Sequence, residues 1–498
     1  MSPYETDRRH FERQIAYARP IIVLLALIAL LQQPPSLDVK RPISFLITYL
    51  VLSVCAVLVG KTDGLEIAGC RQGARVAGRI AIEFRHGDAT RTGLPDGGFG
   101  AVVCVLALMA GTSQHALAES SWSFVPGGNV NGTYVRVSAV SAYSPTDAWA
   151  AGYRRVQLGS GTGYEPFTEH WDGSVWAVSY PVTPILVPTN VDDVLNGIAE
   201  LGPHDVWTVG FQATTKGFAP LVEHWNGSAW SVVRTPTVGS MNHAYLLSVD
   251  ARASNDVWAV GSYNVPDPRL GYTSHVLAEH WDGRVWSVVP TPAQAGELYS
   301  VSEYASNNVW ATGTDGGALM EHWDGSKWAV IPSPSAVYAP NPSHPLNSLM
   351  TSINVASPSD VWAAGYSYGY AVPEQTLTEH WNGRKWSIVS SPSPGDNAAL
   401  FGIAAKPCSS VDPLGVVCTG AEAWAVGFSE SVGPRGGALD NPLIERWDGN
   451  KWQVTPVNSP QPDQSYFTAV SRAPGTTSLL GVGNVTQGSI PGLFAVNR

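Results

Sequence analysis

Residues 169–176, Glu-His-Trp-Asp-Gly-Ser-Val-Trp, place a carboxylate, an imidazole and two indoles within eight positions. Such a set could serve acid–base or metal chemistry. The segment is repeated, however, at 223–230, 279–286, 321–328, 379–386 and 445–452. Self-similarity with a period of about 40–65 residues is typical of a repeat architecture. A catalytic group is needed once, whereas a structural group is needed in every repeat, so we interpret this hairpin motif as structural.

One repeat, residues 245–292, predicts four short strands. The runs are YLLSVDA, VWAVGSY, VLAEHW and VWSVVP, and turn residues separate them. Asp282-Gly283 predicts a two-residue type I′ turn between the third and fourth strands, because Asp-Gly between apolar runs is a strong hairpin signal. Asp-Gly or Asn-Gly occupies this place in all six copies.

Side-chain alternation places Leu277, Glu279 and Trp281 on one face of the third strand and His280 on the other. We expect the tryptophans to fill the space between neighbouring sheets and the Glu and His residues to hydrogen-bond to backbone or cross-strand partners. A metal site built from this motif would require six equivalent positions, one in each repeat, to converge, so no metal or cofactor is predicted.

The tryptophans define where the ring of sheets closes. The six repeats account for 18 of the 19 Trp residues. The last one, Trp122, lies in SWSFVP, which matches a fourth strand, and the C-terminal segment supplies only three strands, with Leu480 at a Trp position. An N-terminal strand that completes the last sheet removes exposed edges. The sequence therefore predicts an all-β, seven-bladed β-propeller of four-stranded antiparallel blades over 119–498, whose structural series is Trp122, Trp171, Trp225, Trp281, Trp323, Trp381 and Trp447.

The order DVWAVG, loop, LxEHWDGxxW and SVVPxP resembles the kelch repeat, which belongs to galactose-oxidase-like propellers. The single Gly of each second strand departs from the double Gly of kelch, and EHWDG replaces its Tyr-Asp pattern. The DGxxW turn also resembles the Asp-box hairpin of sialidase-like propellers. The resemblance implies a propeller of an uncharacterised bacterial exported type, and such a fold alone does not specify an activity.

The first 118 residues differ from the rest. They contain apolar runs that predict membrane helices at about 15–33, 43–60 and 98–112, and a signal-like cleavage site follows Ala118. Arginine and lysine residues precede the first run and lie between the second and third, which places both flanks in the cytoplasm. The propeller is then membrane-anchored outside the cytoplasm or secreted after cleavage. The alternative is that 1–90 is a fused or mis-started reading frame.

Charge and cysteine content narrow the possible partners. Residues 1–118 hold 12 Lys/Arg and 9 Asp/Glu, which leaves a net charge of −14 on the other 380 residues of a chain whose formal charge is −11. An acidic region without a basic stripe argues against nucleic acid. Only Cys408 and Cys418 lie beyond residue 118, and in an oxidising compartment they predict a disulfide that closes one inserted loop. A metal or redox pair is the alternative.

Variable loops supply the candidate binding surface. The connections between second and third strands and between blades vary in length and emerge on one face, where function is expected. Tyrosines in these loops could stack on sugars or anchor a protein, or could pack among themselves. The candidate ligand-binding residues are Tyr164, Tyr263, Tyr272, Tyr338, Tyr366, Tyr368 and Tyr370.

Three hypotheses follow. The favoured one is a noncatalytic module that binds a surface polysaccharide or a protein partner, with no catalytic residue. The second is an enzyme of galactose-oxidase or sialidase-like type. Against an oxidase, the two cysteines lie in one insertion, and against a sialidase no Arg cluster is visible, although Arg154, Arg269 and Arg435 could form a triad in space. The third is an extracytoplasmic sensor domain.

Overall fold

The computed structural model describes residues 122–497, apart from short gaps. These gaps are at 133, 159–160, 182–191, 240–242, 294, 335, 337–345, 371, 407–409, 412–417, 420–421, 434–436, 458, 460–463 and 486–492. The chain divides into a unit of residues 1–119, which lies outside the described part, and a second compact unit of residues 120–498. The predicted helices at 15–33, 43–60 and 98–112 and the cleavage site after Ala118 therefore lie outside the described residues. Within the described part no helix has the length and apolarity needed to cross a membrane.

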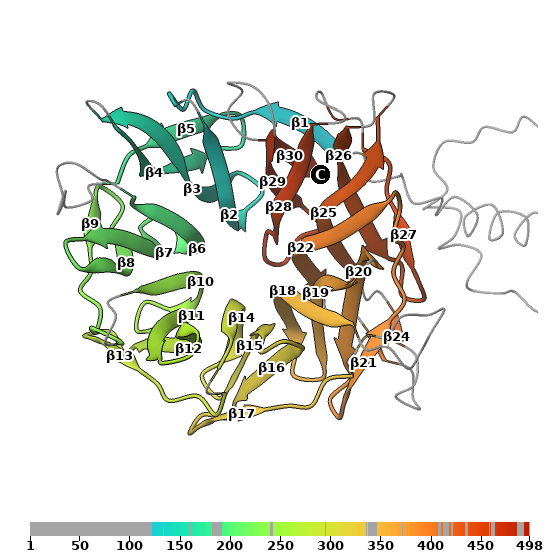
Figure 1. Ribbon diagram of the computed structural model, residues 1–498. Helices are drawn as coiled ribbons and strands as arrows, with labels where there is room; N and C mark the ends of the chain where they lie inside the picture. Colours follow the sequence, from blue (N-terminus) through green and yellow to red (C-terminus); the bar gives the residue numbers. More distant parts are fainter. Residues whose placement is uncertain are drawn as a thin grey trace, which may run out of the picture. The chain divides into compact units, whose positions relative to one another are not determined.

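The described strands form seven four-stranded antiparallel sheets and one two-stranded ribbon. The sheets stand around a common centre, and each contributes one innermost strand (Figure 1). These first strands are β2 (Val135–Ser144), β6 (Val194–Gly202), β10 (Ala244–Ala253), β14 (Glu297–Ala305), β18 (Asn347–Ser357), β22 (Asn397–Lys406) and β28 (Ser465–Arg472). The second strands are β3 (Asp147–Leu158), β7 (Asp205–Thr214), β11 (Asp256–Asp267), β15 (Asn308–Thr314), β19 (Asp360–Gly369), β25 (Glu422–Val432) and β29 (Leu479–Val485).

Two further strands complete each sheet towards the outside. The third strands are β4 (Gly161–Trp171), β8 (Gly217–Trp225), β12 (Gly271–Trp281), β16 (Ala318–Trp323), β20 (Val372–Trp381), β26 (Ala438–Trp447) and β30 (Leu493–Asn497). The outermost strands are short: β5 (Trp176–Ser179), β9 (Trp230–Val232), β13 (Trp286–Val288), β17 (Trp328–Val330), β21 (Trp386–Val389), β27 (Trp452–Val454) and β1 (Trp122–Pro126). The two-stranded ribbon pairs β23 (Ser410–Val411) with β24 (Cys418–Thr419).

The ring closes as the sequence predicts. Strand β1 pairs antiparallel with β30, so the N-terminal strand completes the sheet β1-β30-β29-β28. Trp122 is buried and its ring lies 5.9 Å from that of Trp424 in the preceding blade. On the other side, Leu480 packs in one cluster with Trp171 and Trp176 of the first blade, as expected for a residue at a Trp position.

Tryptophans form the contact between successive blades. In five interfaces the Trp of a second strand lies between 5.0 and 5.4 Å from the third-strand Trp of the next blade and between 5.1 and 5.8 Å from its fourth-strand Trp. Aromatic pairs at these separations contribute roughly 0.5–1.5 kcal/mol each beyond their burial. The structural interpretation of the hairpin motif is therefore confirmed for its tryptophans.

Two local predictions were wrong. The Asp-Gly turn is not a two-residue turn, because Trp171 pairs with Trp176 and residues 172–175 form a four-residue connection. Asp172 explains the difference: its Oδ1 accepts hydrogen bonds from the backbone N–H groups of Ser174 and Val175, and Gly173 has a positive φ, of 92°.

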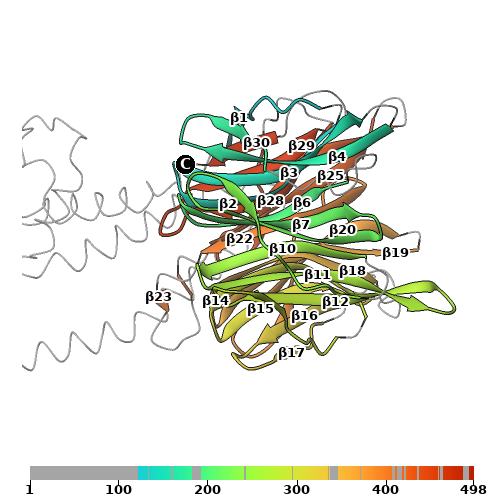
Figure 2. The same cartoon turned by 90° about the vertical axis from the view of Figure 1, so that its left-hand side faces the viewer.

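The second error concerns the connections between second and third strands, for example residues 153–166 and 367–377, which the sequence analysis treats as variable loops. They continue the ladder instead, with Leu158 opposite Gly161 and Gly369 opposite Val372. Tyr164, Tyr263, Tyr272, Tyr366 and Tyr368 consequently lie in strands, where β-branched and aromatic residues favour extension of a hairpin. Figure 2 shows such a long hairpin formed by β11 and β12.

A single glycine in each second strand has a steric reason. Gly152 faces the first strand so closely that a Cβ atom would lie 2.0 Å from the carbonyl oxygen of Arg136. The other six sheets repeat this approach at 1.8–2.1 Å, with Gly210, Gly261, Gly313, Gly365, Gly427 and Gly483. Beside it each first strand carries a β-bulge, which turns the bulged residue towards the centre of the ring.

Candidate functional site: the central cavity

The hairpin motif holds each blade together and leaves its imidazoles engaged. Nε2 of His170, His224, His280 and His380 lies 2.7–2.9 Å from an Asp Oδ1 at the start of the second strand, and His322 meets Asn308 in the same way. Because every one of these oxygens is an acceptor, Nε2 carries the hydrogen in all five. Each ring also packs on a second-strand Trp, with centroids 4.3–4.6 Å apart.

The sixth repeat replaces both partners together. Arg446 stands at the His position and donates to Glu422, which stands at the Asp position, with Nε 2.7 Å from Oε1. Its guanidinium lies over the ring of Trp424, 5.3 Å from the ring centroid. The imidazoles of the other repeats pack on their second-strand tryptophans in a similar way. The exchange preserves a hydrogen bond and a contact with the tryptophan ring but no acid–base property, which supports the structural interpretation of the His series.

The glutamate of the motif is buried in all six copies. Glu169, Glu223, Glu279, Glu321, Glu379 and Glu445 are each 0% exposed. Some of these carboxyl groups hold the chain segment that enters from the preceding blade: Glu169 accepts from the N–H of Gly128 at 2.9 Å, and Glu379 from the Ser333 hydroxyl at 2.5 Å. Burial raises the pKa of Glu169 to about 7 and that of Glu279 to about 8. The expected hydrogen bond to backbone is thus confirmed for Glu169, and this carboxyl group lies in the interior.

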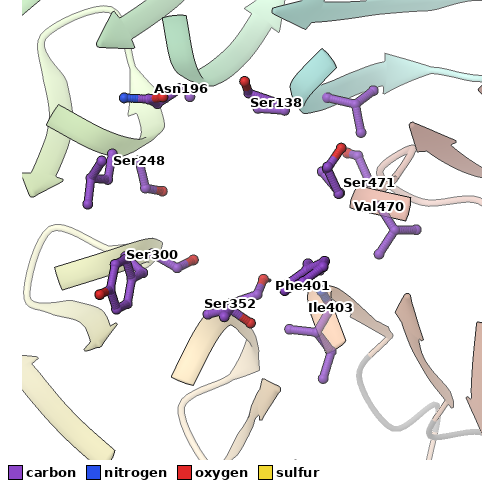
Figure 3. Close-up of a pocket in the computed structure, with 18 of the residues that line it drawn as sticks. Ser138, Asn196, Ser248, Ser300, Ser352, Phe401, Ile403, Val470 and Ser471 are labelled. Atoms are coloured by element: carbon purple, nitrogen blue, oxygen red, sulfur yellow. Dashed lines mark hydrogen bonds between the residues drawn. The ribbon is translucent and has the colours of Figure 1, made fainter. Parts of the chain in front are cut away.

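A cavity of about 800 Å³ occupies the centre of the ring, and all seven first strands line it. Figure 3 shows labelled side chains from these strands converging around it. Small polar residues form part of the wall, including Ser138, Asn196, Ser248, Ser300 and Ser352. The size suits a ligand of a few hundred daltons.

Hydrogen bonds between neighbouring first strands make the wall rigid. The hydroxyl oxygens of Ser248, Ser300 and Ser352 each accept from a backbone N–H of the next blade, at 3.2 Å. Two residues further along the first strands, a second set of side chains also accepts a hydrogen bond from a backbone N–H of the next blade. These acceptors are Ser141, Asp250, Ser302, Asn354 and Ser471. Burial raises the pKa of Asp250 to about 6, against the opposing effect of the N–H groups of Glu303 and Ala251. These accepting hydroxyls retain their own hydrogens, which could be donated to a ligand.

One end of the cavity is aromatic, and we call it the cavity mouth. Its residues are Arg136, Tyr153, Tyr299, Tyr366, Phe401, Phe428, Asp440 and Tyr466. Arg136 and Tyr466 are the second residues of β2 and β28, so the mouth lies where first strands begin. This is the face on which the connections between blades arrive. The sequence analysis places the candidate binding surface on this same face.

The aromatic rings of the mouth are in contact with one another. Phe401 lies 6.5 Å from Tyr366, 5.7 Å from Phe428 and 6.3 Å from Tyr466 between ring centroids. The ring centroids of Tyr134 and Tyr153, which both act on Arg136, are 6.3 Å apart. Burial raises the pKa of Tyr153, Tyr366 and Tyr466 above the usual value, so these phenols are neutral at physiological pH.

Arg136 is half-buried among tyrosines. Burial acts to lower the pKa of Arg136, whereas Tyr153, Tyr466 and Tyr134 act to raise it. The net result is a pKa above the usual value, so the guanidinium is charged. Among the described residues no carboxylate forms an ion pair with it, whereas Arg154 pairs with Glu165 at 2.9 Å. The cavity mouth therefore presents a cation that the described part of the protein leaves without a counter-ion.

The predicted ligand residues divide into three groups. Tyr366 lines the cavity, and Tyr164 and Tyr368 touch mouth residues, through Tyr153 and Tyr366 respectively. Tyr263 packs on His275, Tyr272 is exposed on β12, and Tyr370 is fully exposed at 102%. Tyr338 and Cys408 lie outside the described residues, and of Cys418 only the backbone is described, so the predicted disulfide stays a prediction.

Sequence reasoning missed Arg136 and the polar wall. A usable signal existed, because the position that faces each second-strand glycine differs in every blade. It holds Arg136, Val194, Tyr245, Glu297, Leu349, Ala399 and Tyr466. Within the described residues no group of three or more His, Cys, Asp or Glu side chains is arranged to hold a metal ion. Of the three arginines named for a triad, Arg154 is engaged with Glu165, and Arg435 lies outside the described residues.

The antiparallel four-stranded blades, set in a closed ring around a lined cavity, define a β-propeller. No protein-family model and no curated protein matches the sequence.

Solved structures with a similar course of the chain include Ycf48 bound to D1 peptide, at 12% identity and a TM-score of 0.45, over 77% of this chain and 96% of that one. Ycf48 from Cyanidioschyzon merolae matches at 13% identity and a TM-score of 0.44, over 75% and 98%. A Trypanosoma rangeli sialidase in complex with sialic acid matches at 9% identity and a TM-score of 0.39, over 76% and 57%. The assignment as a propeller rests on the strand pairing of this chain.

Proposed function

We propose that this β-propeller is a noncatalytic binding module that takes its ligand at the cavity mouth. The ligand is a surface polysaccharide, and a protein partner is the alternative. The observation that carries the proposal is the contiguous set of rings from Tyr366 through Phe401 to Tyr466 beside the polar wall. Flat aromatic faces pack against the C–H faces of sugar rings, and neighbouring hydroxyl and amide groups satisfy sugar hydroxyls.

The rigidity of the wall also supports a binding role. Backbone groups of adjacent blades are tied through Ser248, Ser300 and Ser352, so a ligand would meet preformed partners. Preorganisation lowers the entropy lost on binding, which favours recognition of a small polar ligand. A sugar that enters such a cavity end-on would leave the rest of a polysaccharide on the face where the blade connections lie.

The decisive experiment measures binding of the full-length chain to a panel of bacterial, plant and fungal polysaccharides. Tyr366→Ala removes a ring from the mouth, and Tyr370→Ala, at a fully exposed position outside it, is the matched control. We expect at least one polysaccharide to bind, with about tenfold weaker affinity for Tyr366→Ala and unchanged affinity for Tyr370→Ala. Binding that neither variant alters would place the ligand elsewhere, and a panel without any ligand would favour the protein partner.

The kelch-type assignment and export belong to the same proposal. Its supports are the order of the four strands, the tight approach at the second-strand glycine and the apolar runs with basic flanks before residue 119. An exported or membrane-tethered propeller would meet surface polysaccharides directly. Fractionation of cells and N-terminal sequencing of the native protein test this: a chain that remains intact in the soluble cytoplasmic fraction would contradict it.

A further inference from the structure

The positive charge of Arg136 in the cavity mouth indicates which class of ligand binds there. This inference rests on the proposed binding function. Arg136 lies among three tyrosine hydroxyls, lines the cavity and forms no ion pair with a described carboxylate. A charged group that is partly removed from water is stabilised by a counter-charge or strong hydrogen bonds. The tyrosines can supply hydrogen bonds but no negative charge at physiological pH.

Three other arginines among the described residues are paired with carboxylates. Arg154 binds Glu165, Arg252 binds Asp256 and Arg446 binds Glu422. Arg136 differs from these three because the side chains that act on its charge are tyrosines, and no described carboxylate is paired with it. The guanidinium has five N–H donors in a planar fork, which matches a carboxylate through two parallel hydrogen bonds.

The overall charge limits what kind of anion fits. The chain carries a formal charge of −11, and the residues beyond 118 are more acidic still, so a long polyanion would be repelled by the surface. Among the described residues that form the mouth, Arg136 is the only cation, and the carboxyl group of Asp440 forms no ion pair with it, so Arg136 can pair with one carboxylate of a ligand. The ligand that suits both facts carries a single carboxylate at its buried end.

We propose that the cavity mouth binds the terminal residue of a carboxylate-bearing oligosaccharide, with its carboxylate on Arg136 and its sugar ring against the aromatic arc of Tyr366, Phe401 and Tyr466. Asp440, which also lines the mouth, accepts hydrogen bonds from sugar hydroxyls.

The test uses matched pairs of ligands. Short oligomers of galacturonate, glucuronate and mannuronate are each compared with their methyl esters, which keep the ring and lose the charge. The full-length chain is measured by calorimetry or by intrinsic fluorescence, as wild type, Arg136→Gln, Arg136→Lys and Tyr370→Ala. Thermal melting of each variant establishes that it is folded.

We expect at least one acid to bind about tenfold or more tightly than its ester, because a charge-assisted bidentate contact is lost in the ester. Arg136→Gln should abolish that preference, Arg136→Lys should keep part of it, and Tyr370→Ala should keep all of it. The acid form should also lose affinity as salt is raised, whereas the ester should not.

Several results would overturn this inference and leave the proposed function standing. These are equal binding of acid and ester with loss of both in Tyr366→Ala, and an acid preference that persists in Arg136→Gln. Binding of a sulfated glycan without any carboxylated one would overturn the carboxylate assignment. If no acidic oligomer binds while a neutral polysaccharide does, the inference also fails, and a failure of every sugar removes the polysaccharide form of the proposed function as well.

Discussion

The outer hairpins and the cavity mouth belong to the same blades but follow opposite rules. At the outside, the Glu-His-Trp motif recurs with nearly the same contacts, down to His–Asp distances of 2.7–2.9 Å. At the first-strand position that faces the second-strand glycine, the blades hold residues as different as Arg136, Glu297 and Ala399. The periodic residues satisfy needs that every blade has, which are closure of a hairpin and contact with a neighbour. The aperiodic residues meet a need that arises once.

This contrast explains why the most reactive-looking residues of the sequence are scaffold. His280 hydrogen-bonds to Asp256 and stacks on Trp258, so both its polar and its apolar surfaces are used within the blade. Arg136 is inconspicuous in the sequence, yet it keeps a free charge in a lined cavity. In a repeat protein, departure from the period is therefore a better guide to a binding site than the chemistry of the repeated residues.

The largest effect is expected where the periodic contacts close the ring. Trp122→Ala removes a buried indole that packs on Trp424 and Phe467 between the last two blades. Loss of a large buried aromatic typically costs about 3–5 kcal/mol. Chemical denaturation of the full chain should show a loss of this size in the free energy of unfolding.

Tyr370→Ala is the control for Trp122, because a fully exposed side chain should change stability by less than about 0.5 kcal/mol. Similar losses for the two variants would mean that β1 does not hold the ring closed in solution. Trp122→Ala should affect ligand affinity only through unfolding, whereas Tyr366→Ala should do the reverse.

Much of the scaffold could be predicted from the sequence. Strand order, ring closure by Trp122 and the place of Leu480 follow from repetition, since each repeat reports the same local physics six times. The four-residue connection at Asp172 was missed, because an Asp side chain can bind the turn backbone and thereby change a turn type that the Asp-Gly pair alone favours. Arg136 was missed because its importance depends on seven strands that meet at one point, and no single repeat contains that information.

A second prediction concerns the buried glutamates. Burial raises the pKa of Glu279 to about 8, and neither of its carboxylate oxygens has a hydrogen-bond partner among the described residues. The folded protein therefore binds this proton more tightly than the unfolded chain, in which the ordinary value is 4.5. The corresponding stability is complete below about pH 4.5 and is lost as pH rises through about 8.

Glu279→Gln removes this titration. Relative to the variant, the wild type should lose about 1.4 kcal/mol of unfolding free energy per pH unit between pH 5 and 8. Asp172→Asn is the control: hydrogen bonds from the Ser174 hydroxyl and from the N–H groups of Val175 and Ser174 lower the pKa of Asp172 to about 2. That control should run parallel to the wild type in urea unfolding at pH 5, 6.5 and 8. Parallel curves for Glu279→Gln as well would show that Glu279 does not take up its proton on folding.

The smallest effect tests whether the sixth repeat is equivalent to the others. Arg446→His leaves Glu422 opposite a shorter partner, and Glu422→Asp leaves Arg446 with a shorter acceptor. Because both side chains are partly exposed, each single change should cost about 1 kcal/mol or less. The double variant recreates the Asp–His pair of the other blades, so it should recover most of the loss in a double-mutant cycle, with a coupling of about 0.5 kcal/mol or more. Additive losses would mean that Glu422 and Arg446 have separate roles, and the sixth hairpin would then not be equivalent to the other repeats.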